Sequence, residues 1–441
     1  MQAAAMSVAE ILVERDQWVE PKLAVPGPQF HVVHEPPRWG PATRIAFRFV
    51  FSYLALYWLG MFVGYWLSKP MSWVSIHVLR LGHVVTAVMT GSGDSVYEYV
   101  LNFCILMIGI GATVIWSLLD RKRPNYARLQ EWFRSLLRMA VGAMLIAYGA
   151  VKVIQVQMPP LTPSTLMETY GQSTPMHLLW TFMGASKAYN VFAGGVEMLA
   201  GMLLLIPGLT AIGSLVAVGA MANVFMLNMC YDVPVKLFSF HLLFMAAVLA
   251  APDARAMVDF FVYGRRAELH HRQPLLKRKW AKRSLVVVHV LFGGLVVGGS
   301  LFIAYQTKKF YADYAKTPLY GVWSVEEYTV DGSVLPASSP SRWQRLALDI
   351  PTVLVAEANG DQQRFSLKDD PAKHTLNLSQ RNNPLRKGDF AYRQAQPNLL
   401  NMSGQMDGHH IDIRLRRVEL PKSLPLTNRG FHWTNEYPYN H

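Results

Sequence analysis

The feature that most constrains this chain is a set of long apolar windows. About 20 residues, rising about 1.5 Å each, form a helix that crosses about 30 Å of hydrocarbon. Windows of this kind cover residues 45–67, 96–119, 136–154, 190–206, 209–230, 237–251 and 284–305. Only 16% of the residues are charged, against about 25% in soluble domains. The sequence therefore predicts a membrane all-α helical bundle of about seven transmembrane helices.

Basic residues gather in two loops between these windows. One loop holds Arg121, Lys122 and Arg123, and the other is the basic loop 253–283. Such charges mark the cytoplasmic side, and the even number of crossings between the loops places both on that side. We expect a cytoplasmic N-terminal tail (1–44), an external C-terminus and a bacterial inner-membrane location. The net charge of +13 is then a topology signal, and no nucleic-acid partner is expected.

Residues 45–134 hold the first two predicted spans and an unusual segment between them. This segment, 71–89, is apolar but carries His77, Arg80 and His83. Because polar groups are costly in lipid, we expect an external interfacial or re-entrant helix, and whether it spans the membrane stays open. In the following turn, Asp94 or Ser95 is expected to cap the second span.

The segment 318–441 changes character and predicts an all-β barrel or sandwich in the periplasm. Apolar and polar residues alternate in short stretches, as in half-buried strands. The stretches are 325–330, 342–348, 352–356, 375–379, 390–393, 399–403 and 410–415. Dipeptides such as Asp331-Gly332 and Asp407-Gly408 favour hairpin turns. Gly321-Val-Trp323 resembles the start of lipocalins, which implies a lipocalin-like domain that holds an apolar ligand or covers the bundle.

Polar side chains in and beside the later spans form the candidate ligand-binding site, because polar and ionisable groups are energetically costly in lipid and therefore often mark a function. They are Lys152, Glu197, Asn223, Asn228, Asp232, Lys236 and His241. The predicted topology places them all in the outer half of the membrane or at its outer boundary, so we interpret them as a pocket. Glu197 then needs Lys152, Lys236 or His241 as a partner, or else a proton. The alternative is a polar lock that fixes helix register.

Other chemistry has weaker support in the sequence. The histidines show no spacing typical of a metal or haem site, so no metal is expected. Cys104 and Cys230 lie in apolar windows without a C-x-x-C motif, which is typical of small buried hydrophobes. Gly294 and Gly298 have the spacing of closely packed membrane helices. Catalytic residues stay unassigned.

Residues 136–251 resemble the DoxX family of bacterial membrane proteins. The resemblance rests on Tyr148-Gly149 with Lys152, on Phe192-Ala-Gly-Gly-Val-Glu197, and on the four-span layout. It implies a four-helix membrane bundle over residues 135–252, and some DoxX relatives are associated with quinone-linked redox complexes. Glu197 and Lys152 match the positions expected to matter. The two spans before the bundle, the seventh span (284–306) and the β-domain depart from the family.

Three functions follow as hypotheses. The first is an accessory subunit of a quinone-linked membrane redox system, with a quinone as ligand and a protein partner in the bilayer. The second is a non-catalytic scaffold or lipid-binding protein that recruits periplasmic partners. The third is a membrane enzyme that resembles vitamin K-dependent carboxylases and uses Lys152 or Lys236 as base. Whether the protein is an enzyme is left open.

Overall fold

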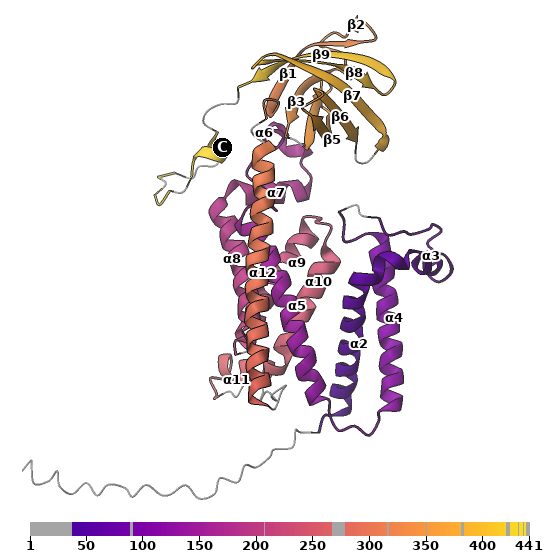
Figure 1. Cartoon of the computed structure of the whole chain (residues 1–441), viewed down its shortest axis with the longest axis vertical. Helices are drawn as coiled ribbons and strands as arrows, with labels where there is room; N and C mark the ends of the chain where they lie inside the picture. Colours follow the sequence, from indigo (N-terminus) through magenta and orange to yellow (C-terminus); the bar gives the residue numbers. More distant parts are fainter. Residues whose placement is uncertain are drawn as a thin grey trace, which may run out of the picture.

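The structure is a computed structural model that describes most of the chain. The described residues are 38–88, 91–206, 208–266, 278–314, 317–349, 351–380, 383–419, 424–430, 432–434 and 436–437. Most of the predicted N-terminal tail and residues 267–277 of the basic loop lie outside them. Helices form the lower body of the molecule and a β-barrel stands on one end (Figure 1).

The seven candidate spans are present as long helices, and their length and apolar composition suit a membrane crossing. The helices are α2 (Pro41–Val63), α4 (Val96–Leu119), α5 (Ala127–Val153), α8 (Lys187–Leu205), α9 (Thr210–Cys230), α10 (Lys236–Ala250) and α12 (Lys279–Tyr314). The predicted fold class, a helical membrane bundle with an all-β domain, is confirmed.

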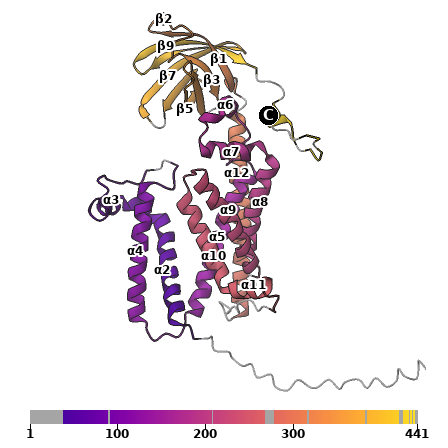
Figure 2. The same cartoon turned by 180° about the vertical axis from the view of Figure 1, so that it is seen from behind.

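Helices α5, α8, α9 and α10 form one bundle, and α2 and α4 form a pair beside it (Figures 1 and 2). The closest helix contact joins α5 to α8 through glycines. A Cβ added to Gly149 would lie 2.4 Å from the Gly194 carbonyl oxygen, and one added to Gly201 would lie 2.6 Å from that of Gly142. Only glycine allows this approach, which brings α8 side chains directly onto α5. Helix α12 packs along the outside of α5 and α8.

The glycines of α12 do not make the close contact that their spacing suggested. A Cβ added to Gly294 or Gly298 would meet nothing within 4 Å. The predicted small-residue packing is therefore wrong for α12 within this chain. Close packing falls instead on the α5–α8 glycines, which are seven residues apart on each helix.

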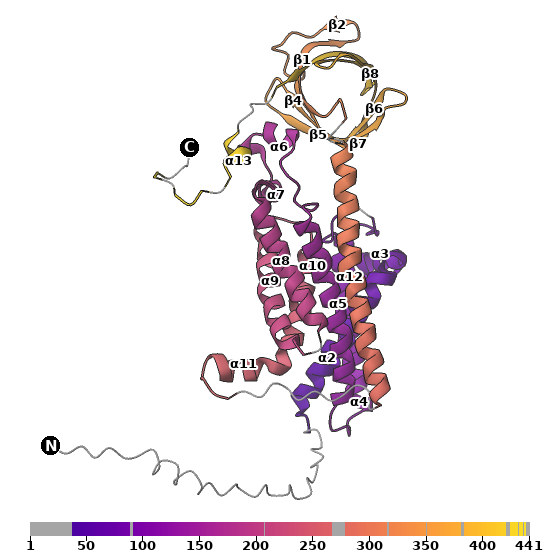
Figure 3. The same cartoon turned by 60° about the vertical axis from the view of Figure 1, so that its left-hand side comes forward.

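The segment between α2 and α4 is helical only in part. The 3-10 helix η2 (Gly64–Leu67) continues α2 and leads into the short helix α3 (Ser68–His77). Helix α3 lies at that end of the α2–α4 pair which is on the side of the barrel (Figures 1 and 3). From Val78 onward the described backbone is irregular, and Arg80 has a positive φ of 53°. The expected helix over 71–89 therefore ends at His77, and the polar groups lie at or after its end.

Short elements connect the spans. They are α6 (Pro163–Met167), η3 (Tyr170–Gln172), α7 (Pro175–Ala185), η4 (Ala251–Asp253) and α11 (Ala254–Phe261). Ser95 caps α4 by accepting a hydrogen bond from the Glu98 amide at 3.3 Å. Asp94 instead caps α10, accepting from the amides of Lys236 at 2.7 Å and Leu237 at 2.9 Å. The turn before α4 is thereby tied to the start of α10.

The C-terminal domain is a closed antiparallel barrel rather than a sandwich. Its strands are β1 (Gly321–Val330), β2 (Ser333–Val334), β3 (Trp343–Leu348), β4 (Thr352–Glu357), β5 (Gln362–Asp370), β6 (Thr375–Gln380), β7 (Asn383–Gln396), β8 (Leu399–Met406) and β9 (His409–Val418). Neighbours pair in the order β1-β3-β4-β5-β6-β7-β8-β9, and β9 pairs back with β1, while β2 extends β1 at the edge. Positive φ at Asp331 and Asp407 confirms the two predicted hairpin turns.

Apolar side chains fill the barrel. Trp323, from the Gly-x-Trp motif, is fully buried, and Phe365 and Phe390 are each 1% exposed. The Trp323 indole N–H donates to the Leu319 carbonyl at 2.8 Å, and the Arg417 guanidinium lies over its ring. A barrel of eight strands is just wide enough for its own side chains. Its interior is therefore a packed core.

Candidate functional site

Lys152 and Glu197 form a buried ion pair between α5 and α8. Lys152 lies in the last turn of α5, and its ammonium donates to Glu197 Oε1. The side chains are only 7% and 5% exposed. Gly194 lies one turn before Glu197, and its contact with α5 sets the close helix spacing that lets the two groups meet. Of the three partners that the sequence allowed for Glu197, the structure selects Lys152.

His241 lies on α10 and contacts α2. Its ring stacks on Tyr57, with centroids 3.9 Å apart and planes 5° apart. Nδ1 lies 2.7 Å from the Leu237 carbonyl, and Nε2 lies 2.7 Å from the Tyr53 hydroxyl. Because a carbonyl can only accept, Nδ1 carries a proton, and in the neutral ring Nε2 accepts from Tyr53. His241 therefore joins the four-helix bundle to the α2–α4 pair.

The remaining predicted site residues lie apart from these two groups. The Lys236 ammonium is 2.8 Å from Asp232 Oδ1, at the end of the bundle facing the barrel. Asn228 is buried on α9, and its Nδ2 has no partner among the described residues. Asn223, also on α9, is exposed on the outside of the bundle. The seven predicted residues thus form no single lining.

A cavity of about 550 Å³ lies between the α2–α4 pair and helices α5 and α10. Its volume is within the range of ligand pockets, about 300–1,000 Å³. The polar lining residues include Tyr57, Tyr148, Glu98 and Asn102. The walls are apolar and include Leu101, Ile105, Met144 and Phe238. Apolar walls with a few convergent polar groups suit a ligand that has both a ring and hydrogen-bonding oxygens.

Of the predicted ionisable groups, His241 contacts a residue of the cavity lining. Tyr57 carries His241 on its ring, so the histidine is in the layer directly outside the lining. Tyr148 precedes Lys152 by one helical turn, and its ring stacks on Phe238. The lining also contains an unused acceptor, because Asn102 donates to the Glu98 carbonyl at 2.8 Å while its Oδ1 is buried and has no partner in the part of the chain that the structure describes.

Sequence reasoning missed the residues that line this cavity. Tyr57 was not singled out because tyrosines are common in membrane helices, and Tyr148 entered only through the motif that carries the DoxX resemblance, not as a site residue. Glu98 was the available signal, since it is an acidic residue in the first turn of a span. No group of three or more His, Cys, Asp or Glu side chains that could hold a metal occurs among the described residues.

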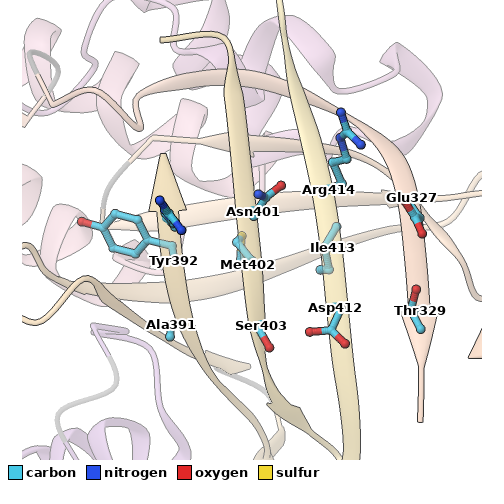
Figure 4. Close-up of a pocket in the computed structure, with 11 residues that line it drawn as sticks. Glu327, Thr329, Ala391, Tyr392, Asn401, Met402, Ser403, Asp412, Ile413 and Arg414 are labelled. Carbon is cyan, nitrogen blue, oxygen red and sulfur yellow. The ribbon is translucent and has the colours of Figure 1, made fainter. Parts of the chain in front are cut away.

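A second hollow, of about 410 Å³, lies on the outer face of the barrel. Figure 4 shows its side chains on neighbouring strands β7, β8, β9 and β1. The register aligns Arg393, Asn401 and Arg414 across one row, and small residues such as Ala391 and Ser403 hollow the next. Unlike the cavity in the bundle, this hollow carries charged side chains of both signs, Glu327 and Asp412 beside Arg393 and Arg414.

The barrel is also held by the α5–α7 connector (residues 154–174). Asp349, which follows β3, accepts from the Thr162 hydroxyl at 2.8 Å, from the Ser164 amide at 3.1 Å and from the Ser164 hydroxyl. Burial raises the pKa of Asp349, while the hydrogen bonds from Ser164 and Thr162 act in the opposite direction. On the same side of the barrel, Glu168 pairs with Arg364 at 3.0 Å.

The fold and the site define a multi-pass membrane protein with a closed β-barrel domain. No family model and no solved structure matches the chain. The uncharacterized protein YwoB of Bacillus subtilis (strain 168) is 32% identical over 124 residues, which are 28% of this chain and 79% of YwoB. The chain therefore belongs to the same family as YwoB.

Proposed function

We propose that this protein binds a quinone or a similar ring-bearing amphiphile in the cavity between the α2–α4 pair and the bundle, as an accessory subunit of a membrane redox system. The observation that carries the proposal is the cavity itself. It combines apolar walls with two phenols, a carboxyl and an unpartnered amide oxygen. The resemblance of residues 136–251 to the DoxX family is part of the proposal and points to the same ligand class.

Each polar group has a definite task in this proposal. The hydroxyls of Tyr57 and Tyr148 donate to the ligand's carbonyl oxygens, and the Asn102 amide oxygen accepts from a quinol hydroxyl. Reduction of a quinone consumes two electrons and two protons. A protein partner in the membrane supplies the electrons, and Glu98 passes protons at the cavity wall. His241 and the Lys152–Glu197 pair hold the two tyrosines in place.

A pair of tryptophan substitutions on α2 tests the proposal. Met61 lines the cavity and is 46% exposed, whereas Leu59 is 54% exposed and lies outside the lining. The protein is purified in mild detergent and its extracted quinones are quantified by mass spectrometry. We expect Met61→Trp to lower the quinone content at least about tenfold, and Leu59→Trp to leave it unchanged.

Equal quinone content in wild type, Met61→Trp and Leu59→Trp contradicts the proposal. Glu197→Gln gives a further comparison, because it alters the group behind Tyr148 without touching the cavity wall. The non-catalytic scaffold is the alternative that the hollow on the barrel favours. It predicts full function with Met61→Trp and loss of function when residues 318–441 are removed.

A further inference from the structure

A separate cavity of about 300 Å³ lies at the other end of the bundle, away from the barrel. It is formed where α2 and α5 begin and α10 ends. Its walls are mainly apolar and include Phe47, Val50, Phe133, Leu137, Val248 and Leu249. Trp39, Thr43 and Gln130 add polar atoms to the lining. Because the spans end at this level, the cavity is at the depth of the lipid headgroups.

Arg134 gives this cavity an unusual chemistry. Its side chain is 8% exposed and lines the space. Nη2 donates to Asp253 Oδ2 at 2.6 Å, but Nε and Nη1 are buried and have no partner among the described residues. An unmade hydrogen bond on a buried charged group is costly, so a second acceptor is needed. The free N–H groups of a guanidinium match the oxygens of a phosphate.

The ion pair with Asp253, which joins α5 to η4, does not by itself explain why an arginine is present at position 134. That contact uses one nitrogen, and the Leu249 carbonyl shares the same nitrogen at 3.4 Å. A lock would be complete with a lysine, which offers a single point charge. The side chain that is present has two further nitrogens in the lining of an apolar cavity.

Further positive charge lies beside this cavity. Arg44, next to Thr43, donates from Nη1 to the carbonyls of Arg121 at 3.2 Å and Arg123 at 3.0 Å. The loop that holds Arg121 and Arg123 is thereby held close to the start of α2. Basic pockets between membrane helices favour anionic lipid headgroups.

We propose that this cavity binds one anionic phospholipid, with its phosphate on Arg134 and an acyl chain along the apolar walls between α2, α5 and α10. The apolar walls favour a lipid over a free phosphate, and the positive charge of the loop that holds Arg121 and Arg123 favours an anionic headgroup over a zwitterionic one. The lipid would join the α2–α4 pair to the bundle on the side opposite the quinone cavity. The inference does not depend on the function proposed above.

The test uses the full-length protein, delipidated in detergent and titrated with phosphatidylglycerol, with phosphatidylcholine or with inorganic phosphate. Native mass spectrometry counts bound lipid, and thermal unfolding measures stabilisation. Ala46 lines the cavity and is exposed, so Ala46→Trp closes the space without breaking the Arg134–Asp253 pair. Ile45, 50% exposed and outside the lining, is the matched control site.

We expect wild type and Ile45→Trp to bind one phosphatidylglycerol at least about tenfold more tightly than Ala46→Trp, as the loss of charge-assisted hydrogen bonds implies. Phosphatidylcholine should bind more weakly, and inorganic phosphate should give no stabilisation. Equal phosphatidylglycerol binding by the two tryptophan variants overturns the site. Equal binding of the two lipids overturns the anionic preference, and stabilisation by inorganic phosphate overturns the assignment to a lipid.

Discussion

Lys152 and Glu197 each carry a charge that the bundle interior would not accept alone. Removing one partner of a buried ion pair leaves the other without compensation, and this costs about 3–5 kcal/mol. Replacing both by apolar residues is often neutral or stabilising, because the two desolvation costs disappear together. Comparing single and double substitutions of Lys152 and Glu197 therefore tests whether the charges at this position serve stability or function.

The prediction is that Lys152→Met alone destabilises the protein by about 3–5 kcal/mol, whereas the double variant Lys152→Met with Glu197→Met lies within about 1 kcal/mol of wild type or above it. Unfolding in detergent, followed by circular dichroism, measures both. A single variant as stable as wild type would mean that the two groups do not depend on each other. The quinone content of the stable double variant is then measured. A loss of quinone means that the ion pair positions the cavity lining, and an unchanged content means that it serves packing alone.

At the same scale, sequence reasoning found the ionisable groups but not their surroundings. Lys152, Glu197 and His241 were recognisable because charge and imidazole are rare in apolar windows. Asn223 was grouped with them on membrane depth alone, and depth does not fix which way α9 presents a side chain. Tyr57 became relevant only through its ring contact with His241, which joins residues far apart in the chain.

At the scale of elements, the α5–α8 contact depends on glycines at two levels. A Cβ added to Gly194 would lie 2.6 Å from the Gly149 carbonyl oxygen and 2.7 Å from the Lys152 Cβ, but one added to Gly195 would meet nothing within 4 Å. Gly194 therefore has no room for a methyl group, whereas its neighbour Gly195 does. Sequence shows the pair Gly194-Gly195 without telling which member faces α5.

The prediction is that Gly194→Ala destabilises the protein by about 1–3 kcal/mol, since the helices must separate to accept the methyl group. Gly195→Ala should be neutral or stabilising by up to about 1 kcal/mol, because alanine favours a helix more than glycine does. Thermal unfolding of the two variants side by side decides the matter. If both variants lose the same stability, the loss does not come from the α5–α8 contact.

The elements themselves were largely predictable, and the errors have physical causes. Long apolar windows define spans because backbone groups in lipid must bond within a helix. The expected helix over 71–89 stops at His77. Hydrophobic periodicity could not predict this end, because it does not reveal where a chain leaves the apolar phase. The barrel's closure could not be read from alternation, which is the same in a sandwich. Closure requires β1 to pair with β9, a contact between the two ends of the domain.

At the scale of the whole molecule, the start of α2, the α4–α5 connection and α11 lie at one end and the barrel lies at the other (Figure 1). The basic loops therefore share an end. Because basic loops stay in the cytoplasm, we predict a cytoplasmic N-terminus and a periplasmic barrel. In a Cys104→Ser, Cys230→Ser background, Asp361→Cys should react with a membrane-impermeant maleimide in spheroplasts. Arg121→Cys should react only after lysis, and the reverse pattern would invert the topology.

The position of the barrel on the bundle depends on two attachments, since α12 leads into β1 and the α5–α7 connector docks on Asp349. A barrel tied by α12 alone would be free to turn. We predict that Asp349→Ala frees the part of the connector around Thr162 and Ser164 while the Glu168–Arg364 pair and the barrel core persist, because three hydrogen bonds are lost at one carboxylate. Amide exchange at residues 162–168 should accelerate at least about tenfold, as expected for bonds to a charged group of about 1.5–3 kcal/mol each.

Asp361→Ala is the control for this prediction, because among the described residues the Asp361 carboxylate accepts a hydrogen bond only from Asn359, within its own turn. Acidification supplies a second check of the same contact. Burial raises the pKa of Asp349 above its ordinary value of 3.8, so the docked state binds a proton more tightly than the released state. Docking should therefore weaken as the pH rises from 3.8 through the raised pKa, and strengthen as the pH falls. If release instead increases in acid, the hydrogen-bonded carboxylate, and not its burial, governs the attachment.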